Sequence, residues 1–191
     1  MSSTIPVIVC GGNSERMGMD KYLLNYHGSP QFLHLTKILS PYFNDIRYSI
    51  QEKQIPAFNN YKNTIVDLPP YSGHGPISGL LSSFEILKDH SILFIGCDYP
   101  LIDADDLLRL VNKENRTSAY FDKYYEPLLA FYSANDHLLL KSEFSNGNFS
   151  LNKFLEKINA RKIISDHPER LKSVDTRTDF DQTKASLNRI V

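Results

Sequence analysis

A glycine-rich stretch with two cations stands near the start of the chain, directly after an apolar run. Residues 5–10 have the composition of a buried strand, and the run ends at Gly11 and Gly12. Glycines let a backbone turn tightly and approach a ligand, because no Cβ intrudes. The following loop carries Arg16 and Lys21, whose positive charges attract phosphate. Together these residues indicate a nucleotide-phosphate site, although a surface turn with two solvated cations would have the same composition.

A candidate metal-binding carboxylate follows the most apolar run of the chain. Residues 91–97 predict a central strand, and Asp98 comes directly after it. Open α/β sheets bind their ligands at the carboxyl ends of such strands. A carboxylate is also the hard oxygen ligand that Mg²⁺ prefers. By position alone, Asp98 could equally cap the turn before the helix predicted at residues 103–111.

The glycine stretch does not match either of the two common phosphate loops. A Walker loop requires Gly-Lys-Ser/Thr at its end, whereas Gly18 is followed by Met19. The Gly-x-Gly-x-x-Gly spacing of dinucleotide-binding proteins is absent as well, which argues against a dehydrogenase.

Composition narrows the class of protein. The chain has 191 residues, of which 41% are hydrophobic and 23% charged, so we expect one globular domain over residues 1–191. A net charge of −1 gives no electrostatic reason to expect nucleic acid as a partner. No apolar run approaches the roughly 20 residues that span a bilayer. The first residues do not resemble a signal peptide either, so we expect a cytoplasmic protein without membrane partners.

The chain contains two cysteines, Cys10 and Cys97, each at the end of an apolar run. Two are too few for a disulfide scaffold or a four-cysteine zinc site. We expect both to be small buried side chains, and a bridge between them stays open because both strand ends could lie near one site.

Strand-like and helix-like segments alternate along the chain, as a parallel sheet requires. Pro76 suits the first position of a helix over residues 77–87, which places Gly75 at a helix N-terminus that favours anions. The remaining strands are expected at residues 46–50, 63–66, 118–121, 127–132 and 160–164. The remaining helices are expected at residues 31–39, 103–111, 135–142, 151–158 and 179–190, the last with Thr178 or Asp179 near its cap.

The first stretch resembles the pattern of the molybdenum cofactor guanylyltransferases, the MobA family, roughly Leu-Ala-Gly-Gly-x-Ser-x-Arg-Met-Gly-x-Asp-Lys. In this chain it reads Val9-Cys10-Gly11-Gly12-Asn13-Ser14-Glu15-Arg16-Met17-Gly18-Met19-Asp20-Lys21. Val9 and Cys10 replace Leu and Ala, and both substitutions keep a small apolar side chain.

Further blocks resemble the same family in order and spacing across nearly the whole chain. They are Asp67 with Gly75-Pro76-Ile77-Ser78-Gly79-Leu80, the strand ending in Cys97-Asp98-Tyr99-Pro100, and Glu126-Pro127-Leu128 with Tyr132. The terminal block departs most, because Ser173, Asp175 and Arg177 stand where the family has Asn, Asn and Pro.

The resemblance implies a three-layer, Rossmann-like α/β fold with a mostly parallel central sheet and helices on both faces. It also implies a Mg²⁺-dependent transfer of GMP from GTP to molybdenum-loaded molybdopterin, with pyrophosphate as the second product. The N-terminal half would bind the nucleotide and the C-terminal half the acceptor. Transient contact with other proteins of molybdenum cofactor biosynthesis is a further family expectation.

Family positions assign roles to particular residues. Arg16, Lys21 and Asp98 would be catalytic, with Asp98 holding the metal and Asp175 a possible second ligand. The nucleotide would be bound by Val9, Cys10, Gly11, Gly12, Lys21, Ser49, Asp67, Gly75 and Asp98. Ser49 falls where the family can carry Asn.

Three alternatives remain open at this stage. A cofactor cytidylyltransferase or a sugar-phosphate nucleotidyltransferase would use the same fold. Gly11-Gly12 and the block from Gly75 to Gly79 favour GTP, and the short chain argues against extra sequence for a sugar. A non-catalytic nucleotide-binding assembly protein is a third possibility, which the presence of Arg16, Lys21 and Asp98 disfavours.

Overall fold

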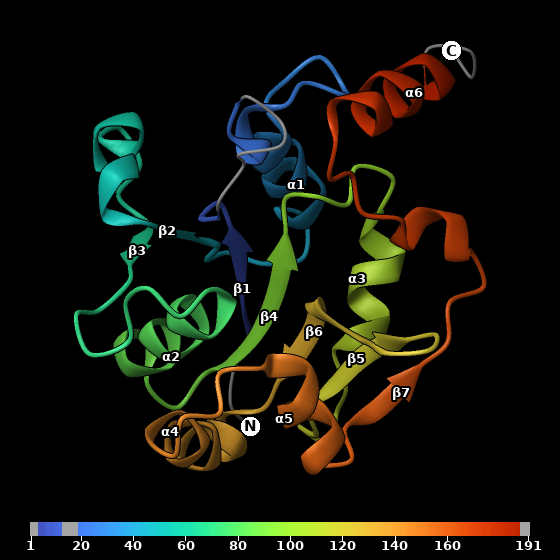
Figure 1. The fold of residues 1–191 in the computed structure, drawn as a ribbon. Coiled ribbons are helices and arrows are strands. Elements are labelled where there is room, and N and C mark those ends of the chain that lie inside the picture. Colours follow the sequence, from blue (N-terminus) through green and yellow to red (C-terminus); the bar gives the residue numbers. More distant parts are fainter. Residues whose placement is uncertain (1–3, 13–18, 188–191) are drawn as a thin grey trace.

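A single seven-stranded sheet forms the centre of the molecule (Figure 1). The computed structural model describes residues 4–12 and 19–187. In the order β3-β2-β1-β4-β6-β5-β7, β4 occupies the middle of the sheet, as its apolar sequence predicts. The strands are β1 Thr4–Val9, β2 Arg47–Ile50, β3 Thr64–Val66, β4 Ser91–Gly96, β5 Ser118–Phe121, β6 Tyr125–Tyr132 and β7 Arg161–Ile163.

The sheet is mostly parallel, which confirms the expected fold class. β1 pairs in parallel with β2 and β4, and β2 with β3. β6 is antiparallel to both of its neighbours, and β5 pairs in parallel with β7. The carboxyl ends of β1 to β4 therefore meet at one edge, whereas β6 brings its amino end to that edge.

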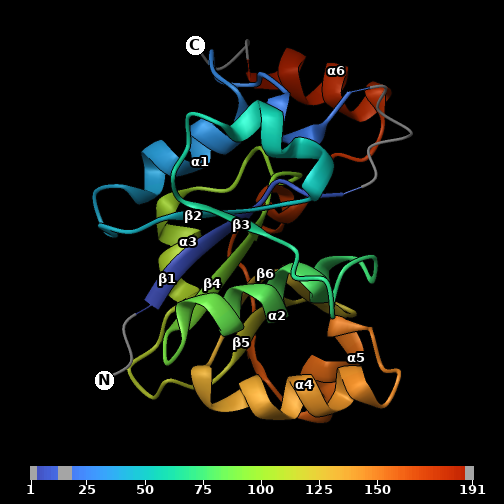
Figure 2. The same cartoon turned by 90° about the vertical axis from the view of Figure 1, so that its left-hand side faces the viewer.

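Helices cover both faces of the sheet and complete three layers (Figure 2). Val7 and Val9 of β1 pack toward α2, α4 and α5, while Ile8 between them packs toward α1 and α3. This alternation is the period of two that a strand buried on both faces produces. The helices are α1 Gln31–Leu39, α2 Pro76–Leu87, α3 Ala104–Leu110, α4 His137–Ser145, α5 Leu151–Lys157 and α6 Arg177–Leu187.

The last helix lies at the edge of the sheet rather than on a face (Figure 1). Phe180 of α6 packs against Tyr26, with ring centroids 4.9 Å apart, in a small cluster that includes Leu24 and Val174. The C-terminal segment is thereby anchored beside the residues that follow the glycine stretch.

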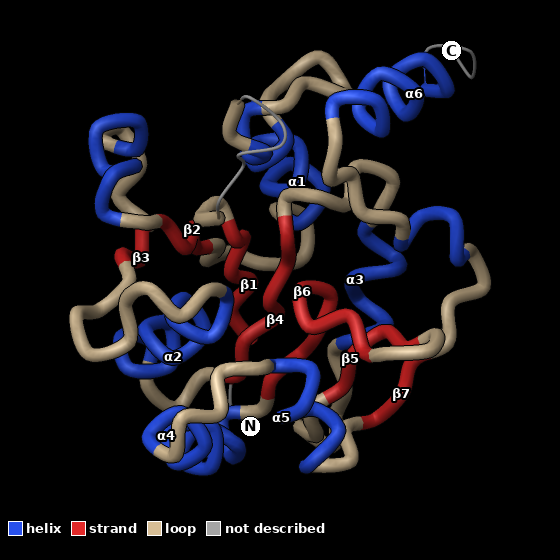
Figure 3. The backbone as a smooth tube through the Cα atoms, viewed as in Figure 1, coloured by secondary structure: helices blue, strands red, loops and turns tan. Residues whose placement is uncertain are grey.

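Most predicted elements form at or within two residues of their expected bounds (Figure 3). The beginning of α6 was predicted too late. It begins at Arg177, because Thr176 and Asp179 cap each other's backbone N–H groups. The 3₁₀ helix Glu52–Phe58 was not predicted, since Pro56 lies inside it and its apolar spacing is weak.

None of the helices in the described part of the chain has the length and apolarity needed to cross a bilayer.

Candidate active site

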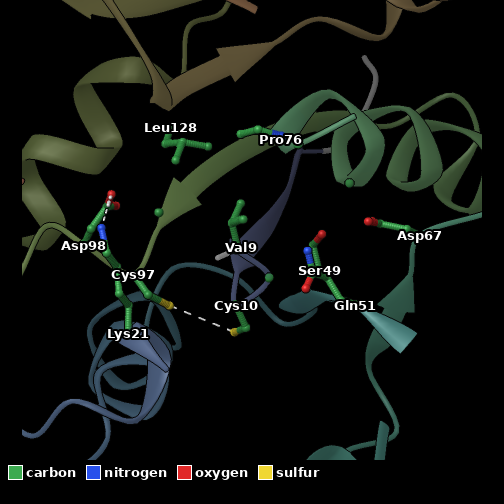
Figure 4. A pocket seen from close by; sticks show the side chains of 15 residues that line it. Val9, Cys10, Lys21, Ser49, Gln51, Asp67, Pro76, Cys97, Asp98 and Leu128 are labelled. Atoms are coloured by element: carbon green, nitrogen blue, oxygen red, sulfur yellow. Dashed lines mark hydrogen bonds and ion pairs between the residues drawn. The ribbon is translucent and has the colours of Figure 1, made fainter. Parts of the chain in front are cut away.

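A pocket opens at the edge where β1 to β4 end, beside the N-terminus of α2 (Figure 4). Its empty volume is about 770 Å³, including the space open to solvent at its mouth. The pocket is lined by Val9, Cys10, Gly11, Gly12, Lys21, Ser49, Gln51, Asp67, Gly75, Pro76, Gly79, Gly96, Cys97, Asp98 and Leu128.

All nine residues predicted to bind the nucleotide line this one pocket. They come from the ends of four strands, the start of α2 and the 3₁₀ helix Lys21–Leu23, which the fold brings together even though they are far apart in the sequence. Arg16 lies outside the described residues, so its predicted role stays a prediction.

The backbone that follows β1 is held against β2. The N–H groups of Cys10 and Gly11 donate to the carbonyl oxygen of Ser49 at 2.9 and 3.1 Å, and the Cys10 carbonyl accepts from Gln54 Nε2 at 3.0 Å. These two N–H groups are therefore engaged within the fold. A Cβ on Gly11 would lie 3.3 Å from Gln51 Cγ, so a glycine lets the chain pass close to Gln51 there.

Asp98 lies at the end of β4 with its carboxylate largely buried. Its Oδ1 atom has no hydrogen-bond partner among the described residues. Burial raises the pKa of Asp98, and the nearby Lys21 ammonium offsets part of that increase. The side chain is confined as well, because a Cβ on Gly96 would collide with Asp98 Oδ1. A buried carboxylate oxygen without a hydrogen-bond partner destabilises the fold, but it is well suited to bind a cation.

Lys21 connects two carboxylates that are far apart in the sequence, Asp98 and Asp175. Its Nζ atom lies 3.5 Å from Asp98 Oδ2 and 2.5 Å from Asp175 Oδ1. Asp175 is positioned by the Ser173 hydroxyl, which donates to its Oδ2 at 3.0 Å. The N–H of Val174 donates to the Asp98 carbonyl at 2.8 Å. The C-terminal block is thus fixed against the end of β4, with Asp175 across Lys21 from Asp98.

Ser49 and Asp67 form the other end of the pocket (Figure 4). Burial raises the pKa of Asp67 to about 6. Gly79 of α2 lies directly over both, because a Cβ there would collide with Ser49 Oγ and lie 3.7 Å from Asp67 Oδ1. The missing side chain of Gly79 therefore leaves room for these two polar groups.

The two cysteines meet at the base of the pocket. Both are free thiols, and their sulfur atoms are 4.0 Å apart across β1 and β4. Burial raises the pKa of the Cys97 thiol. They are small buried side chains, as predicted.

Six lining residues were not predicted: Gln51, Pro76, Gly79, Gly96, Cys97 and Leu128. Most of them belong to the sequence blocks that resemble the MobA family. Their places within those blocks were the signal that could have identified them. Gln51 is the exception, because it follows β2 at the edge of the pocket without a recognisable pattern.

A family profile for the MobA-like NTP transferase domain matches residues 6–171. The chain belongs to this family. This membership confirms the resemblance read from the sequence blocks and shows a nucleotidyltransferase domain over most of the chain.

Curated relatives agree with this assignment, and a solved structure has the same fold. The chain is 27% identical over 155 residues to a molybdenum cofactor guanylyltransferase from Pseudomonas putida strain GB-1, covering 78% of this chain and 80% of that protein. It is 25% identical over 170 residues to a probable molybdenum cofactor guanylyltransferase from Bacillus licheniformis, covering 85% of each. The structure of molybdopterin-guanine dinucleotide biosynthesis protein A from Archaeoglobus fulgidus shares the fold. Its TM-score is 0.79 at 19% identity, covering 97% of this chain and 99% of that one.

Proposed function

We propose that this MobA-like NTP transferase transfers GMP from GTP to molybdenum-loaded molybdopterin and releases pyrophosphate. The observation that carries the proposal is the placement of Lys21, Asp98 and Asp175 at one end of a pocket whose other end holds Ser49 and Asp67. The names of the curated relatives supply the choice of GTP and of the acceptor.

The reaction requires positioning and charge neutralisation more than a strong base. A phosphate oxygen of the acceptor attacks the α-phosphorus of GTP, forming a new P–O bond. The bond between the α-phosphorus and the α,β-bridging oxygen breaks, and pyrophosphate leaves with the bonding electrons. Because the acceptor phosphate is already ionised near neutral pH, the chain does not need a general base.

Lys21 is the described cation that lines the pocket and faces this reaction. In the proposed complex its ammonium stabilises negative charge on the triphosphate and on the leaving pyrophosphate. Asp98 and Asp175 hold the ammonium in place before the nucleotide binds. Arg16 would add a second positive charge, by its position in the family pattern.

The residues present fit a single Mg²⁺ ion at Asp98. Its buried Oδ1 lacks a partner among the described residues, and its carboxylate has the hard oxygen chemistry that Mg²⁺ selects. In the described part of the chain no group of three or more ligating side chains is gathered, so the metal would be held by few protein ligands. Asp175 is the possible second one. When bound, Mg²⁺ supplies positive charge that neutralises the phosphates.

The rest of the pocket would bind the nucleoside. Ser49 and Asp67 are proposed to contact the base and ribose. The backbone of residues 9–12 is proposed to contact the neighbouring part of the nucleotide. Gly75, with a φ of 75°, adopts a conformation that glycine favours and lets the start of α2 approach the ligand. We propose, as the family resemblance implies, that the N-terminal half binds the nucleotide and the C-terminal half binds the acceptor.

The proposal is tested by following the product. Purified protein with GTP, Mg²⁺ and molybdenum-loaded molybdopterin should form the pterin–guanine dinucleotide, detected by its mass, together with one pyrophosphate per dinucleotide. Removing Mg²⁺ with EDTA should stop both products. Nucleotide binding without either product would contradict molybdopterin as the acceptor. It would favour a non-catalytic protein or an enzyme that acts on a different acceptor.

A further inference from the structure

Glu126 is the first residue of the Glu126-Pro127-Leu128 block, and the proposed reaction gives Glu126 no role. It lies near the start of β6, which runs antiparallel beside β4. The hydroxyl of Tyr99 donates to Glu126 Oε2 at 2.9 Å. A Cβ on Gly96 would meet Asp98 Oδ1, Leu128 Cβ and Tyr99 Cε2 together. Tyr99, which follows Asp98 in the sequence, therefore links Glu126 to the end of β4, where Asp98 and Leu128 line the pocket.

The surroundings of Glu126 do not neutralise its charge. The side chain is half-buried, and its protein partner is the neutral phenol of Tyr99. Negative charges on Asp98, Asp122 and Asp175 all act on it, and none of the described cations forms an ion pair with it. A half-buried carboxylate among like charges is costly unless donors compensate it. This arrangement suits a ligand that brings its own N–H donors.

Glu126 lies away from the end proposed for the guanine. Figure 4 shows Asp67 and Asp98 on opposite sides of the pocket, and Glu126 is tied through Tyr99 to the Asp98 side. In the proposed complex the reacting phosphates would lie between the nucleotide's base and Glu126. The group that reaches Glu126 must belong to the acceptor.

We propose that Glu126 binds the acceptor by accepting two neighbouring N–H groups of a 2-amino-4-oxo-pyrimidine ring, the edge that a pterin carries. A carboxylate is the side chain that accepts two parallel N–H donors at once. Tyr99 acts as a positioning residue, because its hydroxyl fixes the carboxylate's orientation. This inference rests on the proposed function and names the residue that would select its acceptor.

The test is the variant Glu126→Gln, which keeps the shape and still accepts a hydrogen bond from Tyr99. The amide places an N–H₂ donor where the pterin also presents donors. We expect KM for molybdenum-loaded molybdopterin to rise about 10- to 100-fold, the loss typical of a hydrogen bond to a charged group. KM for GTP and the thermal unfolding midpoint should stay at the wild-type values.

Glu85→Gln is the matched control. Glu85 also accepts a hydrogen bond from a tyrosine, the Tyr71 hydroxyl at 2.7 Å, but it pairs with Lys141 near the end of α2, whereas the start of α2 borders the pocket. It should change neither KM. Binding of molybdenum-loaded molybdopterin, measured by calorimetry without GTP, should weaken by the same factor in Glu126→Gln and stay constant in the control.

The two possible failures are distinguishable. If the wild type forms the dinucleotide and Glu126→Gln has an unchanged KM and affinity for the acceptor, the inference is wrong and the proposed function stands. If the wild type binds Mg-GTP but neither binds nor converts the molybdopterin, the proposed function fails, and this inference fails with it.

Discussion

The two ends of the pocket are assembled in different ways. At the end proposed for the nucleoside, called the nucleotide end below, neighbouring parallel strands place Ser49, Asp67 and residues 9–12 at one sheet edge through backbone pairing. At the Asp98 end, which we propose faces the acceptor and call the acceptor end, side chains make the connections: Lys21 pairs with Asp175, and the Tyr99 hydroxyl donates to Glu126. Backbone pairing tolerates single substitutions, whereas a side-chain connection is lost with one residue. Substitutions at the acceptor end should therefore affect turnover more than those at the nucleotide end.

The largest effect is expected from Asp98→Ala, which removes the carboxylate proposed to hold the metal. Turnover should fall by about 10²–10³ or more, the usual loss for a group that stabilises charge in the transition state. The fold should survive, with an unfolding midpoint near that of the wild type. Pyrophosphate release measured across a Mg²⁺ titration checks this, with the exposed Asp105→Ala of α3 as control. Wild-type activity at saturating Mg²⁺ would reject the metal role.

Lys21→Ala should have the next largest effect, because its ammonium is proposed to neutralise charge on the triphosphate and on the leaving pyrophosphate. Its ammonium pairs with Asp98 and Asp175, and its loss leaves those carboxylates without that cation. We expect kcat/KM to fall by about a hundredfold. Steady-state kinetics for both substrates measure this loss, with the exposed Lys37→Ala of α1 as control. Near-normal kinetics would make Lys21 an ordinary surface lysine.

Gly79→Ala probes the nucleotide end alone. Its methyl group would displace the Ser49 hydroxyl and crowd Asp67, so KM for GTP should rise about tenfold or more while the acceptor KM stays constant. Adding Ser49→Ala to this variant should relieve the crowding at Ser49 but not at Asp67. An equal rise in both Michaelis constants would contradict the separation of the two ends.

The smallest effect concerns the pH dependence of stability. Burial raises the pKa of Asp67 from 3.8 to about 6 in the folded protein. Between these two pH values Asp67 is mostly ionised in the unfolded chain but still protonated in the folded protein. The contribution of Asp67 to the free energy of unfolding therefore falls as the pH rises from about 4 to about 6, and it is constant above that range. Asp67→Asn lacks this contribution.

The unfolding midpoint of Asp67→Asn, measured without nucleotide, should therefore exceed that of the wild type at pH 7.5, and the difference should shrink toward pH 4.5. Equal midpoints at every pH would show that Asp67 is solvated in the folded protein. Asp105→Asn, at an exposed position of α3, is a suitable control because it removes the same single negative charge.

The contrast between the ends also explains what the sequence could predict. The α/β fold and the strand ends follow from apolar runs that end in polar loops, so Asp67 and Asp98 could be placed at one sheet edge. The contact between Lys21 and Asp175 could not be predicted, because the two residues are 154 positions apart and α6 brings them together through Phe180 and Tyr26. Gln51 was missed because it follows β2 in a segment with no recognisable pattern.

The most direct test of the central proposal is pyrophosphate release with molybdenum-loaded molybdopterin and Mg²⁺, with GTP, CTP, ATP and UTP offered separately. We predict release with GTP and not with the other three. Release with CTP alone would keep the mechanism at Lys21 and Asp98 but overturn the guanylyltransferase assignment. No release with any nucleotide, from protein that binds Mg-GTP, would contradict the proposed reaction.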